Sequence, residues 1–380
     1  MSNKKIILII NSASFFLSHR LNLFYALKNN NYKPILFIGS SGNEKIENQA
    51  RLKLNKLNIN FVKLKFLSSS TNIFFEISCL YELIINIKLI NPRIIYAVSN
   101  KPILLGGISS FFFKKTYLFI AFSGLGYIYT EINSLKNFFI KKIFNIFLQI
   151  IFLKKNKIII TQNIDDSNFI KNFYNTKNFI HIVKGSGINT NYFKSENVKK
   201  DKVVLFPGRL LIHKGIIDFI EASKILKLKF PEWKFVVIGG EYSDNPSSIR
   251  QNLISDLKSN NSIEFISYSE SILEWYNKSM IVCLPSYREG MPKSILEASS
   301  CKCAIVTTNV PGCKEAIINN QTGLLVEKND IDGIVDSVAY LIKNNEECSR
   351  YGHNGREYML KEFDEKIILS QFINIFKMIN

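Results

Sequence analysis

Short apolar runs that alternate with longer, helix-length stretches constrain the fold of this chain more than any other feature. In the first half the runs fall at 5–10, 33–39, 59–64, 93–99 and 116–124, with helical stretches at 18–29 and 72–89. The second half repeats the rhythm, with runs at 202–209, 234–240, 262–267, 280–286 and 303–309. Continuous apolar runs are typical of parallel strands covered by helices on both faces. The pattern therefore predicts an α/β protein with two doubly wound, Rossmann-like sheets.

The length of 380 residues also favours two domains, because one hydrophobic core seldom supports so long a chain. The segment 190–202 is polar and has no periodic pattern, so we place the boundary there. We expect an amino-terminal domain at 1–195, a carboxy-terminal domain at 196–363, and a final helix at 364–380 that crosses back to the first domain. Two such domains facing across a cleft would bind ligands at the carboxyl ends of their strands.

The basic excess of the chain belongs entirely to its first half. Residues 1–200 hold 28 lysines and arginines against 8 acidic residues, whereas residues 201–380 hold 21 against 23. A compositional drift would affect both halves alike, so we favour a polyanionic partner over a merely lysine-rich surface. The lysines are not interleaved with aromatic side chains as in nucleic-acid-binding surfaces, so an anionic membrane is the preferred partner and nucleic acid is not expected.

The six cysteines show no disulfide or metal-site spacing, and we interpret them as reduced residues of a cytoplasmic protein. The start of the chain resembles a signal peptide, but Asn11 and Ser12 interrupt its apolar run, so a buried first strand is the better interpretation. No segment reaches the roughly 18 apolar residues that a membrane-spanning helix needs.

The loop "FPGRLLIHKG" at 206–215 has the residues expected of a diphosphate site. Gly208 ends a predicted strand, and Arg209 and Lys214 place two cations near the start of the next helix. An arginine fork, a lysine point charge and the amides of a helix start all favour phosphate oxygens. Taken alone, this pattern belongs more often to a solvated surface than to a binding site.

A second loop, "SYREGMPKSILEA" at 286–298, carries two glutamates around a turn. Pro292 suits the first position of a helix, which would leave the amides of Lys293 and Ser294 free for a ligand. Glu289 would precede that helix and Glu297 would lie one turn into it. One carboxylate can bind the hydroxyls of a sugar and the other the hydroxyls of a ribose, with phosphates between them. Separately, each glutamate could be a surface charge or a helix cap.

With both loops included, the sequence resembles those of the family-4 retaining glycosyltransferases, which have the GT-B architecture. The resemblance extends over most of the chain and includes features of the subgroup that builds bacterial surface polysaccharides. It rests on "GRLLIHKG" (208–215), "LPSYREGMPKSILEASSC" (284–301), "IVTTNVPGCKEAI" (305–317), "QTGLLVEKND" (321–330), "NKPILLGG" (100–107) and "FSGLGYIYT" (122–130).

The resemblance implies roles for individual residues. Arg209 and Lys214 would bind the donor diphosphate, Glu297 the ribose, and Glu289 the transferred sugar near its reacting carbon; Glu289, Arg209 and Lys214 are the expected catalytic residues. The other donor-binding residues would be Gly208, Gly290, Met291, Pro292 and Lys293.

The resemblance also implies retention of anomeric configuration with no metal and no cofactor beyond a UDP-sugar co-substrate. The cations would stabilise the leaving diphosphate, so no protein base is required. Asp165 and Asp166 are accordingly interpreted as a surface loop or helix cap instead of a metal pair.

Three departures from the family pattern concern the amino-terminal domain and one helix of the second. The first strand is followed by "NSAS" (11–14) where many relatives have a glycine pair, and Ser123 stands where a histidine is common. The Gly-x-Pro after the second glutamate's helix is replaced by "CKCA" (301–304). His19 and Arg20, at the expected start of the first helix, either contact phosphate or acceptor or serve capping and packing. The acceptor-side candidates are Ser14, His19, Ser123 and Gly124.

Residues 134–157 form an unusual segment, with a wide face of Phe and Ile and with Lys154, Lys155 and Lys157 at its end. A basic amphipathic helix of this kind can lie in a membrane interface. A helix packed inside the domain explains the apolar residues but not the lysines, so we favour peripheral membrane contact.

Taken together, the sequence predicts an enzyme that moves a hexose or N-acetylhexosamine from a UDP-sugar to a lipid-diphosphate-linked glycan precursor at the inner face of the cytoplasmic membrane. The enzymatic alternatives are a nucleotide-sugar epimerase and a soluble glucan synthase of the same fold. The non-enzymatic alternative is a basic protein that binds nucleic acid or membrane.

Overall fold

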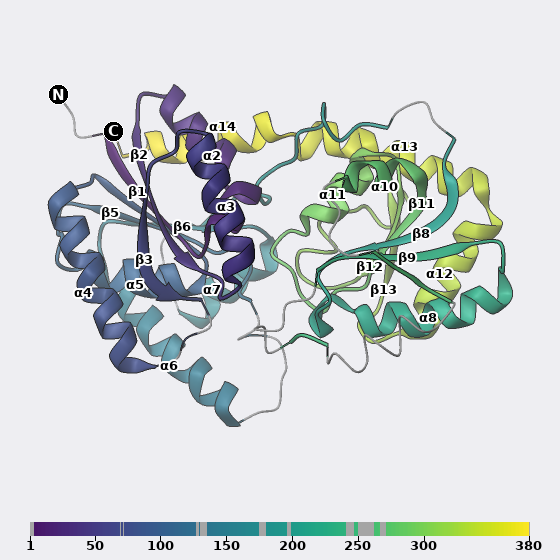
Figure 1. The fold of residues 1–380 in the computed structure, drawn as a ribbon, viewed down its shortest axis with the longest axis horizontal. Helices are drawn as coiled ribbons and strands as arrows, with labels where there is room; N and C mark the ends of the chain where they lie inside the picture. The colour runs from purple at the N-terminus through teal and green to yellow at the C-terminus, as the bar shows by residue number, and fades with distance from the viewer. Residues whose placement is uncertain are drawn as a thin grey trace. The chain divides into compact units, whose positions relative to one another are not determined.

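The computed structural model describes residues 4–68, 70, 72–126, 129, 135–174, 180–195, 199–240, 247–249, 262–266 and 271–379. The chain divides into two compact units (Figure 1). The amino-terminal unit comprises residues 1–186 and 369–380, and the carboxy-terminal unit comprises residues 187–368. The sequence-based boundary at 195/196 lies nine residues further along.

The amino-terminal unit is built on a seven-stranded sheet with the order β3-β2-β1-β4-β5-β6-β7, in which every neighbouring pair is parallel. Its strands are β1 (Lys5–Ile10), β2 (Lys33–Ser40), β3 (Phe61–Leu67), β4 (Ile94–Val98), β5 (Tyr117–Ala121), β6 (Lys157–Thr161) and β7 (Ile180–Ile182). Its helices are α1 (Ala13–His19), α2 (Leu21–Asn29), α3 (Glu44–Lys56), α4 (Ile73–Ile90), α5 (Asn100–Ser110), α6 (Leu135–Phe152) and α7 (Ile164–Phe173).

The carboxy-terminal unit has a six-stranded parallel sheet with the order β10-β9-β8-β11-β12-β13. Its strands are β8 (Asp201–Pro207), β9 (Lys234–Ile238), β10 (Glu264–Ile266), β11 (Ser279–Leu284), β12 (Ala304–Thr308) and β13 (Gly323–Val326). Its helices are η2 (Ile212–Lys214), α8 (Ile216–Lys229), α10 (Ile272–Lys278), α11 (Lys293–Ser300), α12 (Ile331–Lys343) and α13 (Asn345–Glu362). Two doubly wound parallel sheets confirm the predicted fold class.

The predicted first helix at 18–29 is wrong in its extent. Two helices occupy this region, and α1 begins at Ala13 because the side chain of Ser12 caps it by accepting a hydrogen bond from the amide of Phe15. The chain leaves helical geometry at Arg20, where φ is −132°, and α2 follows. His19 therefore ends a helix instead of starting one.

The last helix, α14 (Glu365–Lys377), passes from one unit to the other, because residues 369–380 belong to the amino-terminal unit. There the ring of Phe376 packs against Phe119 and Tyr96, with centroid separations of 4.7 and 5.6 Å. Phe372 packs edge-on against Tyr96, and the guanidinium of the buried Arg20 lies over the ring of Phe372 in a cation–π contact. The end of the chain thus completes one side of the amino-terminal core.

Of the three lysines that were predicted to flank a membrane helix, Lys154 has a structural role instead. Helix α6 ends at Phe152, and Lys157 begins strand β6. Lys154 is buried, and its ammonium donates to the carbonyls of Ser110 at 2.9 Å and Phe113 at 3.3 Å, just where α5 ends. Burial lowers the pKa of Lys154. The prediction that Lys154 meets the membrane is therefore wrong, because this cation caps the carbonyl end of α5.

We predict that Lys154→Ala destabilises the amino-terminal unit by about 1.5–3 kcal/mol, because it leaves buried carbonyls without their charged donor. Urea denaturation would measure this change. The matched control is Lys155→Ala, since Lys155 is exposed and its loss should cost less than about 0.5 kcal/mol. Equal effects of the two substitutions would show that Lys154 is not a structural cap.

Candidate functional site

The candidate site lies at the carboxyl edge of the sheet in the carboxy-terminal unit. Strands β8 and β11 are parallel neighbours at the centre of that sheet. The carboxyl ends of parallel neighbours lie together, so the loop 208–215 after β8 and the loop 285–292 after β11 are adjacent. These are the two loops that the sequence singled out.

A glycine brings the two loops into backbone contact. Gly215 has a φ of +73°, and a Cβ atom there would lie 2.0 Å from the carbonyl oxygen of Pro285. The amide of Tyr287 also donates to the carbonyl of His213 at 2.9 Å. Only glycine combines this conformation with such a close approach, and the contact fixes the position of Lys214 relative to the second loop.

Lys214 and Glu289 form an ion pair across these loops, with only 15% and 13% of their side chains exposed. Burial by itself would raise the pKa of Glu289, but the charge of Lys214 and its hydrogen bond outweigh burial, so the pKa lies below its ordinary value. Glu289 is therefore ionised at neutral pH. Lys214, which was predicted to bind the donor diphosphate, and Glu289, which was predicted to bind the transferred sugar, therefore contact each other directly.

A third loop holds the backbone of Glu289. Its amide donates to the carbonyl of Pro311 at 3.1 Å. Gly312 has a φ of +84°, and a Cβ atom there would lie 2.5 Å from the carbonyl oxygen of Glu289. The loop after β12 thus packs on the loop after β11 and fixes the backbone of Glu289.

The second glutamate lies on α11, whose N-cap is Pro292. Pro292 was expected to be the first helical residue, but its ψ of 97° is extended, so the helix begins at Lys293. Glu297 lies 3.6 Å from the ammonium of Lys293 and accepts a hydrogen bond of 3.3 Å from the hydroxyl of Tyr276. Burial raises the pKa of Glu297, and Lys293 and Tyr276 oppose that shift only in part.

The remaining predicted residues of this unit lie in the same loops. Gly208 follows β8, and Gly239 packs so tightly against it that a Cβ on Gly239 would lie 1.8 Å from the Gly208 oxygen. Arg209 is exposed on the same loop. Gly290 and Met291 are buried in the turn before α11. All the predicted donor residues therefore belong to one edge of one sheet.

Three side chains that the sequence analysis did not single out support this site. Tyr276 is buried and donates to Glu297, although a tyrosine inside an apolar helix looks like an ordinary core residue. Tyr287 donates to the buried carboxylate of Asp218 at 3.1 Å, which ties the Glu289 loop to α8. The position of Tyr287, two residues before Glu289, could have indicated that it belongs to the site. Nothing in the sequence predicts its hydrogen bond to Asp218.

His213 is the neighbour of Lys214, and its ring contributes no positive charge at neutral pH. Burial, with the nearby charges of Lys214 and Arg209, lowers the pKa of His213 to about 4, against a smaller opposing effect of Glu289. Its Nδ1 lies 2.7 Å from the hydroxyl of Ser247. The site's fixed cations are accordingly lysine and arginine.

The acceptor-side candidates are spread over the amino-terminal unit. The hydroxyl of Ser14 donates to the buried carboxylate of Glu47 on α3 at 2.7 Å, and the amide of Ala13 donates to the same carboxylate at 2.8 Å. This chain therefore places the carboxylate of Glu47 against the loop that follows β1. His19 stacks on Phe15 with ring centroids 4.6 Å apart.

Ser123 and Gly124 follow strand β5. The hydroxyl of Ser123 lies 2.7 Å from that of Ser99, which follows the neighbouring strand β4. Gly124 has a φ of +95°. Ser99 and Ser123 thus meet at the carboxyl edge of the amino-terminal sheet.

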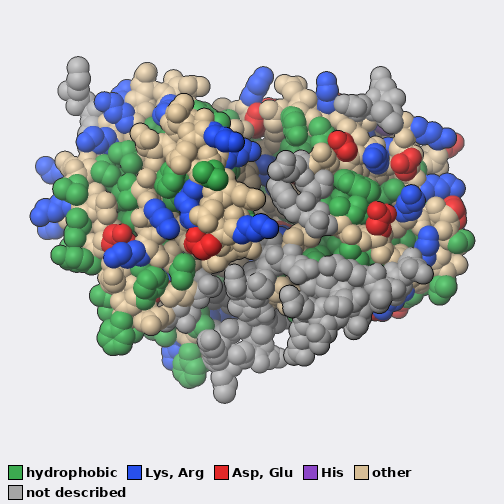
Figure 2. Space-filling model, viewed as in Figure 1, with side chains coloured by type: hydrophobic (Ala, Val, Ile, Leu, Met, Phe, Trp, Pro, Cys, Tyr) green, Lys and Arg blue, Asp and Glu red, His purple; other side chains and the backbone are tan. Residues whose placement is uncertain are grey.

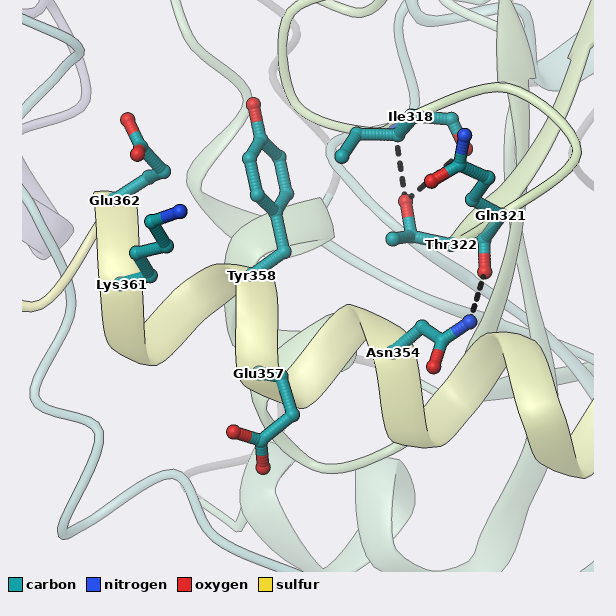
Figure 3. Close-up of a pocket in the computed structure, with 8 residues that line it drawn as sticks. All are labelled: Ile318, Gln321, Thr322, Asn354, Glu357, Tyr358, Lys361 and Glu362. Carbon is teal, nitrogen blue, oxygen red and sulfur yellow. Dashed lines mark hydrogen bonds between the residues drawn. The ribbon is translucent and has the colours of Figure 1, made fainter.

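A surface pocket of about 330 Å³ in the carboxy-terminal unit involves none of the predicted site residues (Figure 3). Its wall is partly closed by a hydrogen bond from Asn354 to the carbonyl of Gln321 at 3.0 Å. The pocket is lined by Ile318, Gln321, Thr322, Asn354, Glu357, Tyr358, Lys361 and Glu362.

Within the described ranges, no group of three or more His, Cys, Asp and Glu side chains is placed to hold a metal ion.

Comparison with known proteins identifies the unit that carries this site. Residues 188–358 match the family described as "Glycosyl transferases group 1". The carboxy-terminal unit belongs to this family. The matched residues include both loops, the Lys214–Glu289 pair and Glu297.

Most of the chain is similar to bacterial glycosyltransferases. An N,N'-diacetylbacillosaminyl-diphospho-undecaprenol alpha-1,3-N-acetylgalactosaminyltransferase of Campylobacter jejuni is 26% identical over 338 residues, 85% of this chain and 87% of the relative. The capsular polysaccharide biosynthesis glycosyltransferase CapM of Staphylococcus aureus is 25% identical, over 80% of this chain and 81% of the relative. The chain is a glycosyltransferase related to enzymes of surface-polysaccharide synthesis.

The fold of the chain is similar to that of a solved glycosyltransferase structure. The crystal structure of a glycosyltransferase from Rickettsia africae superposes with a TM-score of 0.76 at 22% identity, covering 100% of this chain and 99% of the other. Two parallel-sheet, Rossmann-like units of this kind constitute the GT-B fold of glycosyltransferases.

We predict that Gly215→Ala destabilises the carboxy-terminal unit by roughly 2–4 kcal/mol, because alanine is strained at positive φ and its Cβ would displace the Pro285 carbonyl. Thermal or urea unfolding would measure the change. The matched control is Gly355→Ala on α13, where the nearest atom to a new Cβ is 3.6 Å away and a helical alanine should be neutral or stabilise by up to about 1 kcal/mol. Equal tolerance of both substitutions would mean that the two loops do not need their close approach.

Proposed function

We propose that this chain transfers a hexose or N-acetylhexosamine from a UDP-sugar to a lipid-diphosphate-linked glycan precursor, with retention of configuration and without a metal ion. The observation that carries the proposal is the Lys214–Glu289 ion pair at the carboxyl edge of the carboxy-terminal sheet. It places a cation for a diphosphate and a carboxylate for sugar hydroxyls within one contact of each other. The family match of residues 188–358 supports the glycosyl-transfer chemistry.

Donor binding would exchange the partner of Lys214. In the structure Glu289 accepts a hydrogen bond from the ammonium of Lys214. A diphosphate carries more negative charge than one carboxylate, so it would take over Lys214, with Arg209 on the same loop as a second cation. Glu289, released and ionised, can then accept hydrogen bonds from hydroxyls of the transferred sugar.

Glu297 would bind the ribose hydroxyls from the first turns of α11. Its contacts with Lys293 and Tyr276 orient the carboxylate before a ligand arrives. Tyr276 is buried, so its hydroxyl acts on the ligand only through Glu297. The start of α11 between the two glutamates suits a phosphate, because helix amides and the helix dipole favour an anion there.

The transfer step would break the bond between the anomeric carbon and the donor phosphate and form a bond from that carbon to the acceptor hydroxyl. The proton of the acceptor hydroxyl would pass to an oxygen of the departing phosphate. Lys214 and Arg209 would stabilise the negative charge that grows on that phosphate, which is where preorganised charge lowers a barrier most. This assignment gives no step to a protein base.

The acceptor class follows from the relatives and from the charge of the first half of the chain. The Campylobacter jejuni relative is named for a diphospho-undecaprenol-linked acceptor. The basic amino-terminal half suits both an acceptor diphosphate and an anionic membrane surface. We therefore place the protein at the cytoplasmic face of the membrane, bound peripherally.

The decisive experiment incubates the protein with a panel of UDP-, GDP- and ADP-sugars and a polyprenyl-diphosphate-linked sugar, with and without EDTA. We expect transfer from a UDP-sugar only, an unchanged rate in EDTA, and a product whose anomeric configuration by NMR matches that of the donor. Inversion of configuration, or a rate abolished by EDTA and restored by a divalent ion, would contradict the proposal.

We predict that Glu289→Gln abolishes transfer but binds UDP about fivefold more tightly than the unsubstituted protein, because the nucleotide no longer competes with a carboxylate for Lys214. Isothermal titration with UDP and a transfer assay measure the two effects. Glu297→Gln is the matched control and should weaken UDP binding, because Glu297 is assigned to the ribose. Weaker UDP binding in Glu289→Gln would show that Glu289 does not oppose the diphosphate.

A further inference from the structure

Two helices of the amino-terminal unit carry apolar side chains on their outer sides as well as on their inner sides. The inner sides of α4 and α6 belong to the core, through residues such as Leu83 and Leu148. The outer sides expose between 37% and 81% of thirteen large apolar side chains. We call this surface the α4–α6 face, and it consists of Ile73, Phe74, Ile77, Tyr81, Ile85 and Leu89 with Phe138, Phe139, Ile143, Ile146, Phe147, Ile150 and Leu153.

The two outer sides belong to one side of the sheet. Helices α4, α5 and α6 connect β3, β4, β5 and β6 in turn, and α5 packs against both of the others. A Cβ on Gly107 of α5 would lie 2.6 Å from Ile151, so α6 sits close on α5. The outward residues Leu104 and Ile108 of α5 are only partly buried, so they continue the apolar surface between α4 and α6. Figure 2 shows apolar side chains along the lower left of the molecule, where Figure 1 draws α4 and α6.

A helix that is apolar all round is expected inside a large core or against lipid, and contiguous exposed apolar patches of this kind mark interaction sites. Within the described residues, no helix is both long enough and apolar enough to cross a membrane. The face therefore calls for a partner that lies against it.

The charges of the segment that contains the face favour an anionic partner. From residue 83 to residue 164 the sequence has eleven lysines and arginines and one acidic residue. The two glutamates of α4 are occupied inside the unit, because Glu76 pairs with Lys101 at 2.5 Å and Glu82 accepts from the amide of Lys65 at 3.1 Å. The exposed lysines of this region include Lys88, Lys114, Lys115, Lys142 and Lys155.

We propose that the α4–α6 face docks the amino-terminal unit on an anionic lipid surface, with apolar side chains in the interface and lysines against lipid phosphates. A second copy of this chain is a poorer occupant, because a symmetric contact would set these lysines against each other. The inference rests on the proposed function for the acceptor and adds to it the surface that meets the membrane.

The fold relates this surface to the acceptor loops. Helices α4 and α6 each begin after the carboxyl end of a strand, so Ile73, Phe74, Phe138 and Phe139 lie toward the edge of the sheet where Ser99 and Ser123 lie. A protein docked on this face would hold that edge beside the headgroup layer. The sugar-diphosphate end of a lipid-linked acceptor lies in the same layer.

The test is flotation of the full chain with vesicles of phosphatidylethanolamine and phosphatidylglycerol, compared with phosphatidylcholine vesicles. We expect binding to the anionic vesicles and a loss of roughly tenfold or more in the pair variants Phe74→Ser with Ile77→Ser, and Ile143→Ser with Ile146→Ser. Leu52→Ser on α3 and Leu228→Ser on α8 are the matched controls, because both leucines are exposed outside the face and their loss should leave binding unchanged.

A second measurement separates this inference from the proposed function. Transfer to a short-chain, water-soluble diphosphate-linked acceptor should be unchanged in the pair variants, whereas transfer to the same sugar on a vesicle-embedded lipid should fall with the bound fraction. Absence of vesicle binding by the unsubstituted chain, or equal binding by the pair variants, would overturn the inference and leave the soluble-acceptor activity standing. Dimers that dissociate in the pair variants without any vesicle binding would assign the face to a second copy and also overturn it.

Discussion

The ion pair of Lys214 and Glu289 is the interaction on which the site of this protein depends. Two charges that are about six-sevenths buried are costly to hold unless each satisfies the other. They can meet because Gly215 lets the loop after β8 touch the carbonyl of Pro285. The pair keeps Glu289 ionised in a place where burial alone would favour its neutral form. The ion pair is thus neutral as a unit, but it contains a cation that an anionic ligand can take over.

The loops at the carboxyl edge of the sheet carry different charges in the two units. In the carboxy-terminal unit the loops at the carboxyl edge carry Arg209, Lys214 and Lys293, which suits an anionic ligand. In the amino-terminal unit the loop after β1 is closed by Glu47, whose carboxylate accepts from Ala13, Ser14 and Ser41. The carboxylate of Glu47 at the start of α1 makes the binding of an anionic ligand there unfavourable. Part of the positive charge of this unit is carried by exposed lysines of the segment that contains α4 to α6, namely Lys88, Lys114, Lys115, Lys142 and Lys155.

The sequence predicted β1 to β5 and β8 to β12, because continuous apolar runs are local signals, but it did not single out β6, β7 and β13. It placed Glu289 and Glu297 beside α11 and chose both loops that the sheet then brings together. It did not foresee that Lys214 and Glu289 would pair, because that contact needs the parallel neighbours β8 and β11, which are distant in sequence. Lys154 was misjudged for a related reason: its partners, Ser110 and Phe113, lie about forty residues earlier. The sequence did not predict the exposed apolar side of α4, because an apolar helix is expected to be buried until its neighbours in the fold are known.

A crystal structure of the full chain with UDP bound would test the exchange of partners at Lys214 most directly. We predict that the diphosphate contacts the ammonium of Lys214, that the carboxylate of Glu289 has left that ammonium and lines the space beyond the second phosphate, and that Glu297 accepts hydrogen bonds from the ribose hydroxyls. A nucleotide bound elsewhere, or one bound here with the Lys214–Glu289 pair still closed, would contradict it.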